Sequence, residues 1–307
     1  MAMPAPREEA KAPAKRPPML RKILMGTAAT VAFGLGAAKA ARAELIRSPS
    51  LYEGVPKAVA QQYFRVQQSA ATGFHQKAVD LAEKLAAKRP RDPLAHYTRF
   101  QALDELRLRL ITEQVPATSG ERAAANARID DVNAEISKAL AETLKNLRPV
   151  TYAQHVLHGK TLYGAANHQL LIMEKGRGPS TEESYAAAVK AFDRAIQINP
   201  DKADAYYLRG LAKWGLGNRF GAHADFNTAA RIEPDNPYPL LLKARAIRAE
   251  GNPSQALSVV SEAITLARKH RNKPVEKEAR RLLAEFYAQV PIHDLNLLQS
   301  LRARSEM

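Results

Sequence analysis

The sequence contains no cysteine, and this absence removes several classes of site at once. Disulfides, thiolate zinc sites, iron–sulfur clusters, covalent haem attachment and a cysteine nucleophile all require thiols. A lipoprotein anchor is excluded for the same reason, because the lipid is attached to a cysteine. We therefore expect no cofactor that depends on sulfur, and the redox state of the compartment cannot be inferred from thiols.

Aromatic residues are also scarce, at 6% of the 307 residues, whereas 46% of the residues are hydrophobic. An alanine-rich chain with few aromatic residues favours stacked helices over a single deep globular core. Only short stretches alternate polar and apolar residues as strands do. We predict an all-α fold.

Signatures of catalysis are missing as well. The sequence has no glycine-rich phosphate loop, no nucleophile elbow and no Ser–Lys arrangement. His155 and His158 share one helical face, but no third ligand is evident, so we expect no metal site. The adjacent acids Asp130 and Asp131 point apart on a helix and suit solvent better than catalysis. We expect no cofactor and no enzymatic activity.

The N-terminal part has the pattern of an export signal. Residues 1–18 are rich in proline, alanine and charge, which predicts a disordered leader or a misassigned start. Residues 19–43 combine a short basic segment, an apolar run from Ile23 to Ala38 and small residues ending at Ala43, the pattern of a secretory signal. We expect cleavage before Glu44, with 38–40 as an alternative cleavage signal, and a periplasmic mature protein that begins with a linker over 44–58. The alternative is an uncut membrane anchor, although the apolar run is shorter than the roughly 20 residues needed to span a bilayer.

The formal net charge is +15, and the chain stays basic without its N-terminal segment. Such a charge favours acidic partners or anionic membrane surfaces. The run Arg268–Arg281, with seven basic and two acidic residues, is a candidate for peripheral membrane contact, the alternative being an ordinary solvated helix end. We expect no nucleic-acid partner, because the sequence contains no recognised nucleic-acid-binding module.

A period of about 34 residues organises the second half of the chain. Pro200 and Pro234 end matching segments, and a third segment, ending near Leu266, follows in phase without its proline. The shared positions are Ala188, Phe192 and Ala195 in the first segment, Ala222, Phe226 and Ala229 in the second, and Ala256, Val260 and Ala263 in the third. These positions lie on one helical face, where small alanines allow close approach of a neighbouring helix and the larger side chain fills the space between. Proline then ends the helix.

Turn and cap signals recur with the same period. Gly217-Asn218 and Gly251-Asn252 are predicted turns one period apart, and Ser180 with Glu183 forms a capping box. This combination resembles the tetratricopeptide-repeat family, most closely over 203–236 and well over 237–270. The resemblance implies a right-handed superhelical solenoid of helix–turn–helix units whose concave face binds peptides or protein segments.

The resemblance extends upstream with two inserts. Ala78, Ala82, Leu85 and Pro90 reproduce the pattern of the second helix, and Ala141, Leu144 and Pro149 reproduce its end. The spacings from Pro90 to Pro149 and from Pro149 to Pro200 are both longer than one period, which indicates an insert in each of two units. We place these inserts near 115–121 and 176–180. About five units therefore cover 59–273, and capping helices cover 274–307.

The resemblance also implies which residues face a partner, because the first helix of each unit lines the concave groove. The outward positions of these helices form the predicted partner-binding groove: Tyr63, Gln67, Tyr97, Gln101, Tyr207, Leu211, Trp214, Leu241, Arg245 and Arg248. Aromatic and arginine side chains are typical of protein recognition, the alternative being that Tyr207 and Trp214 simply pack between repeats. The Lys/Asn carboxylate clamp of chaperone-binding relatives is absent, but Arg245 and Arg248 are candidates to meet an acidic or C-terminal carboxylate.

Three functions follow as hypotheses. The first is an exported, periplasmic scaffold that binds a protein or peptide, acidic in the favoured case, and assists assembly of a cell-envelope complex. The second is a membrane-tethered subunit that keeps its N-terminal anchor and organises a membrane complex. The third is an accessory hydrolase that uses the 97–180 region, which predicts a polar pocket with a perturbed acid or base there.

Overall fold

The computed structural model describes residues 49–113, 118–172 and 180–287. Within these ranges the chain forms one 3-10 helix and eleven α-helices, and no strand. The elements are η1 (Pro49–Tyr52), α2 (Lys57–Ala71), α3 (His75–Lys88), α4 (Pro93–Glu113), α5 (Ser119–Asn146), α6 (Tyr152–Ile172), α7 (Thr181–Ile198), α8 (Ala203–Gly215), α9 (Arg219–Ile232), α10 (Tyr238–Ala249), α11 (Pro253–Lys269) and α12 (Lys273–Tyr287).

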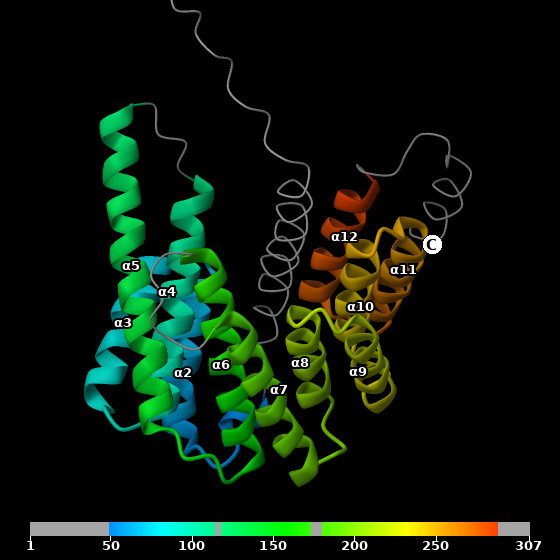
Figure 1. The fold of residues 1–307 in the computed structure, drawn as a ribbon, viewed down its shortest axis with the longest axis horizontal. Helices are drawn as coiled ribbons and strands as arrows, with labels where there is room; N and C mark the ends of the chain where they lie inside the picture. The colour runs from blue at the N-terminus through cyan, green and yellow to red at the C-terminus, as the bar shows by residue number, and fades with distance from the viewer. Residues whose placement is uncertain (1–48, 114–117, 173–179, 288–307) are drawn as a thin grey trace, which may run out of the picture.

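Consecutive helices pack as hairpins that stack side by side. The five hairpins are α2/α3, α4/α5, α6/α7, α8/α9 and α10/α11, and α12 packs on α11 and α10. Figure 1 shows these hairpins arranged one after another in a curved array. The predicted all-α solenoid of helix–turn–helix units is therefore confirmed.

Complementary volumes hold the two helices of a hairpin together. A methyl group added to Gly210 of α8 would lie 2.6 Å from the ring of Phe226 in α9, and one added to Gly159 would lie 2.5 Å from the ring of Phe192. Both rings are fully buried. Such distances leave no room for a side chain at either glycine. The ring of the facing phenylalanine fills the space that a side chain there would occupy. In the α10/α11 hairpin, the residues equivalent to Gly210 and Phe226 are Ala244 and the smaller Val260, both buried.

The second and third hairpins depart from this repeat in length. Helices α4, α5 and α6 contain 21, 28 and 21 residues, against 13, 14 and 12 in α8, α9 and α10. Gly159 and Phe192 of α6/α7 are much further apart in the sequence than Gly210 and Phe226 of α8/α9, so the additional length of this hairpin lies between them. Of the inserts predicted near 115–121 and 176–180, residues 115–117 and 176–179 lie outside the described residues.

Turns and caps follow the predicted signals in most places. Gly217 and Gly251 have φ angles of 76° and 87°, a left-handed conformation that glycine adopts without strain. Ser180 and Glu183 form the predicted capping box at the start of α7. Thr118 and Glu121 form a second capping box at α5, which was not predicted. Asn252 is the N-cap of α11, but its side chain makes no capping hydrogen bond.

Two predicted details are wrong. In α5, Ala141 is exposed, and the buried face consists of Val132, Ile136, Ala139, Leu140 and Thr143. The predicted register of this helix is therefore rotated, because a long alanine-rich helix offers several similar apolar stripes. The second error concerns the linker over 44–58, part of which is packed against the body.

Residues 49–53 contact α2, α6 and the start of α8, and we call them the N-terminal strap. Leu51 is buried in the main core, and the amide of Gln67 in α2 donates to the hydroxyl of Tyr52 at 2.8 Å. The carboxylate of Glu53 pairs with Lys202, at the start of α8. The strap also contacts α6. It therefore joins the first hairpin to the third and fourth, which makes these residues part of the folded body.

Candidate functional site

The ten predicted groove residues lie on α2, α4, α8 and α10, the first helices of their hairpins. Eight of them are buried: Tyr63, Gln67, Tyr97, Tyr207, Leu211, Trp214, Leu241 and Arg245. Gln101 and Arg248 are half-buried. Most of these side chains therefore contact other parts of the protein as the structure stands, and their contact with a partner remains a prediction.

The aromatic members of this set have identifiable packing partners. The hydroxyl of Tyr63 donates to Asp92, which precedes α4. Tyr207 meets Tyr238 of α10 edge to face, with ring centroids 5.3 Å apart, a geometry that aromatic pairs favour. Trp214 meets His223 of α9 at 6.0 Å. The Tyr207 contact agrees with the alternative of packing between repeats, whereas the Trp214 contact lies within one hairpin.

Arg245 and Arg248 both contact the terminal helix α12. Nη2 of Arg245 lies 2.5 Å from Oε1 of Glu278, and the arginine is almost fully buried. Burial lowers the pKa of Arg245, and the charge of Glu278 opposes that change. The guanidinium of Arg248 lies 5.7 Å from the centre of the Phe286 ring, within cation–π range. The carboxylate expected at Arg245 is therefore supplied by the chain itself, and the pair attaches α12 to α10.

The basic run Arg268–Arg281 is similarly engaged within the chain. Arg268 and Arg280 both donate to Oε1 of Glu276, at 3.1 and 3.0 Å, and Arg281 donates to Glu278. These hydrogen bonds lower the pKa of Glu276. Contact of this run with anionic lipid remains a prediction, and fewer of its cations are available for it.

Comparison with known proteins identifies the repeat. A family model described as TPR repeat matches residues 182–217, which cover nearly all of α7 and the whole of α8. Glycine turns and buried contacts between a small and a larger residue continue from there into α9, α10 and α11. The chain is a tetratricopeptide-repeat protein.

Several solved structures are similar to this tetratricopeptide-repeat protein. TTC0263, a thermophilic TPR protein of Thermus thermophilus, is 19% identical with a TM-score of 0.49, over 75% of this chain and 99% of that one. PilW, a type IV pilus biogenesis factor, is 14% identical with a TM-score of 0.44, over 80% and 99%. The TPR2AB domain of yeast Sti1, solved in complex with pHSP90, is 19% identical with a TM-score of 0.37, over 77% and 88%. No curated protein matches the chain.

The 97–180 region of this tetratricopeptide-repeat protein contains a buried polar network. Arg107 of α4 contacts Asp104 and lies 2.9 Å from Nδ1 of His168 in α6. Nε2 of His168 lies 2.8 Å from Oγ of Ser137 in α5. Burial, followed by the charge of Arg107, lowers the pKa of His168 to about 4. A base with a lowered pKa, His168, is therefore present in the region for which the hydrolase hypothesis predicted a perturbed acid or base.

The direction of the hydrogen bonds decides what this network can do. Arginine only donates, so Nδ1 of His168 accepts and Nε2 carries the proton. Nε2 then donates to Ser137, whose own hydroxyl donates to the carbonyl oxygen of Asn133 at 3.1 Å. A general base must accept the proton of its nucleophile. His168 cannot do so in this arrangement, and the network joins three helices without activating Ser137.

The histidine pair of α6 shows no metal-site arrangement. Burial lowers the pKa of His155 and of His158, which keeps both rings neutral near pH 7. No group of three His, Cys, Asp or Glu side chains in the described ranges is placed to hold a metal ion. Likewise, none of the described helices is long and apolar enough to cross a membrane.

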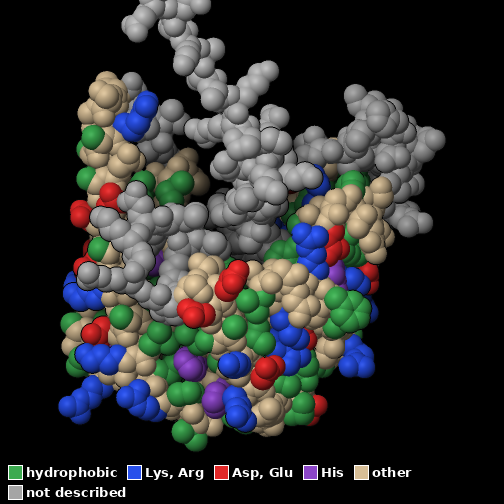
Figure 2. All heavy atoms as spheres, viewed as in Figure 1, with side chains coloured by type: hydrophobic (Ala, Val, Ile, Leu, Met, Phe, Trp, Pro, Cys, Tyr) green, Lys and Arg blue, Asp and Glu red, His purple; other side chains and the backbone are tan. Residues whose placement is uncertain are grey.

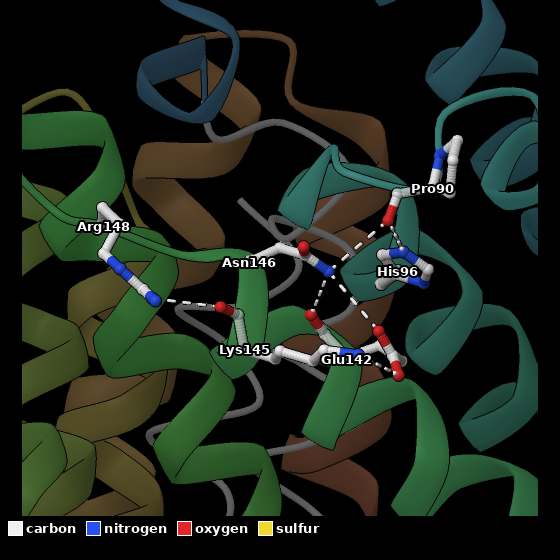
Figure 3. A network of polar contacts seen from close by, with 6 residues as sticks. All are labelled: Pro90, His96, Glu142, Lys145, Asn146 and Arg148. Carbon is white, nitrogen blue, oxygen red and sulfur yellow. Dashed lines mark hydrogen bonds and ion pairs between the residues drawn. The ribbon is translucent and has the colours of Figure 1, made fainter.

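Polar contacts also join neighbouring hairpins at the links between them. Figure 3 shows Asn146, at the end of α5, donating to the carbonyl oxygens of Glu142 at 2.8 Å and of Pro90 at 3.4 Å. His96 of α4 contacts the same Pro90 oxygen at 2.9 Å. The end of the long α5 helix is thereby tied to the link between α3 and α4.

An ion-pair cluster links the third hairpin to the fourth. Arg209 of α8 holds the buried Asp225 of α9 through two hydrogen bonds of 2.9 and 2.6 Å, and Asp193 of α7 at 2.7 Å. Lys213 adds a second cation 2.9 Å from Asp225. Burial acts to lower the pKa of Arg209, but these carboxylates outweigh it and raise the pKa. This cluster was not predicted, although Arg209 and Asp225 directly precede Gly210 and Phe226, the two residues that mark the repeat.

Proposed function

We propose that this chain is an exported scaffold that binds a segment of another protein and assists assembly of a cell-envelope complex. The observation that carries the proposal is the stacking of hairpins in one direction, in which each hairpin mainly contacts its neighbours. Such an arrangement places much of the chain on an extended surface instead of around one enclosed pocket. Figure 2 shows that cations and anions alternate on one face of this surface instead of forming a single charged field. A protein surface with both charges is a suitable partner for it.

Export is supported by the sequence of residues 19–43. The predicted cleavage before Glu44 falls ahead of the strap, so it leaves in place all residues that make the contacts described above. The membrane-tethered alternative is supported by the apolar run Ile23–Ala38. The intact mass of the protein from its own cells separates the two. Loss of residues 1–43 supports the exported form, and an unprocessed mass supports the tether.

Binding is tested by cross-linking the tagged protein in its own cells and recovering it from the envelope fraction. We expect one or a few envelope proteins to be enriched over a matched strain that exports the tag alone. Recovery of the same proteins from both strains would contradict the scaffold proposal. Arg245→Glu is unsuitable as the binding-defective control, because it would break the attachment of α12.

A further inference from the structure

A hollow of about 460 Å³ lies between the N-terminal strap and one face of α2. Its lining includes Tyr52, Lys57, Ala60, Phe64, Arg65 and Gln68. The volume falls within the range of sites that hold a few side chains of a ligand. None of these residues belongs to the predicted groove, although Phe64 and Gln68 directly follow Tyr63 and Gln67.

The strap gives this hollow a fixed wall. The ring centroid of Tyr52 lies 6.1 Å from that of the fully buried Tyr63, and the amide of Gln67 holds its hydroxyl at 2.8 Å. Burial raises the pKa of Tyr52 to about 12, so the wall remains uncharged. The next residue, Glu53, directs its carboxylate to Lys202. The strap therefore contributes an aromatic surface without adding a free negative charge.

The chemistry of the hollow combines an apolar floor with two cations. Phe64 is 52% exposed and supplies an apolar surface to the hollow. Lys57 and Arg65 also line the hollow, and among the described residues neither contacts a carboxylate. Helix α2 itself contains no acidic residue. By contrast, three arginines near the other end of the chain are each paired with a glutamate: Arg245, Arg268 and Arg281.

We propose that this hollow binds a protein segment that carries carboxylate side chains next to an aromatic or aliphatic one. The apolar side chain packs on Phe64 and Tyr52, and the carboxylates pair with Arg65 and Lys57 through charge-assisted hydrogen bonds. The inference names a site and a partner chemistry for the proposed scaffold, and it rests on that function. A membrane surface fits less well, since electrostatic attachment to anionic lipid usually requires four to eight clustered cations.

The test uses two short fluorescein-labelled peptides and three forms of the protein that begins at Glu44. In the first peptide Phe and Leu alternate with Glu, and in the second Ser replaces Phe and Leu at unchanged charge. The site variant is Phe64→Ala with Arg65→Glu. The matched control is Phe74→Ala with Lys77→Glu, which changes an exposed phenylalanine and an exposed lysine of the same hairpin outside the hollow. Fluorescence anisotropy gives the affinities, and circular dichroism checks the fold.

We expect the apolar acidic peptide to bind wild type and control equally, and the site variant at least about tenfold more weakly. The serine peptide should bind all three forms weakly. Equal affinity of site variant and control would overturn the proposal, and so would equal binding of both peptides or no binding by wild type. Binding to phosphatidylglycerol vesicles that only the site variant loses would assign the hollow to lipid and also overturn it.

The envelope cross-linking experiment, repeated with the same two variants, separates this inference from the proposed function. Envelope proteins captured by wild type, control and site variant alike would uphold the scaffold and reject this site. Capture of no specific protein by wild type would reject the scaffold itself.

Discussion

The regular hairpins α8/α9 and α10/α11 and the long hairpins α4/α5 and α6/α7 solve the same packing problem differently. The regular pair relies on small residues opposite larger ones, such as Gly210 with Phe226 and Ala244 with Val260. The long pair uses such contacts over part of its length, including Gly159 with Phe192. Its extra helical turns bring buried polar side chains together, of which Arg107 and His168 are the clearest. In the long hairpins, buried hydrogen bonds therefore add to the apolar packing. Unlike apolar packing, the bonds made by His168 depend on its protonation.

The largest effect is expected from removing the ring in a regular hairpin. Phe226→Ala should lower the free energy of unfolding by about 3–5 kcal/mol, because Gly210 on the opposite helix cannot fill the cavity. Val260→Ala, at the equivalent position of the next hairpin, removes a smaller side chain and should cost about half as much. Urea denaturation of both variants checks the order. A smaller loss for Phe226→Ala would show that the two hairpins do not share one packing rule.

The long hairpins should be the acid-sensitive part of the molecule. The pKa of His168 is lowered to about 4 from 6.5, so the unfolded chain binds the proton more readily than the folded one. Stability is therefore fully present above pH 6.5 and falls by about 3 kcal/mol as the pH drops to 4. Asp104 and Arg107 of α4 and the backbone of Asn133 in α5 are the groups that act on the ring.

His168→Gln isolates this contribution, because glutamine has hydrogen-bonding groups but no proton to gain. Thermal melting from pH 7 to 4 should show a flatter stability profile for the variant than for wild type. Parallel profiles would mean that other groups govern the acid response.

An intermediate effect is expected from the ion-pair cluster inside the regular hairpin α8/α9, which also reaches Asp193 of the long hairpin α6/α7. Asp225→Asn keeps the volume of the side chain but leaves Arg209 and Lys213 facing each other with only Asp193 to balance them. Because breaking a largely buried pair exposes an uncompensated charge, we expect a loss of about 2–3 kcal/mol. Asp193→Asn, which removes the more exposed of the two carboxylates, should cost less than about 1 kcal/mol. Chemical denaturation of both variants compares them, and equal losses would show that burial does not distinguish the two carboxylates.

The same contrast explains what the sequence could predict. The turns at Gly217 and Gly251, and the buried position of Phe226 between helices, follow from a local period, and the structure reproduces them. No such period fixes which face of α5 is buried, because several faces of this alanine-rich helix are similarly apolar. The prediction that Ala141 lies on the packed face was therefore wrong.

Surface residues were harder to predict than the repeat. A shift of one residue rotates a side chain by about 100° around the helix axis. That rotation separates the buried Tyr63 from the exposed Phe64, and within the described residues no repeat precedes α2 to fix its orientation. The contact of Arg245 with Glu278 is distant in sequence and belongs to the capping helix, which carries no repeat signal. An aromatic residue beside an arginine in a helix without acids was the one signal for the hollow at Phe64.

The smallest effect concerns helix caps, where Ser180 of a long hairpin and Asn252 of a regular one differ. The capping box of Ser180 and Glu183 satisfies two backbone N–H groups at the start of α7, a helix of a long hairpin. Asn252 occupies the same place in α11 of a regular hairpin but makes no capping hydrogen bond. Ser180→Ala should therefore lower the free energy of unfolding by about 1 kcal/mol, and Asn252→Ala by only a few tenths. Chemical denaturation of the two variants under one condition measures the difference. A larger loss for Asn252→Ala would mean that its side chain forms the capping bond in solution, as that of Asn218 does at the start of the regular helix α9.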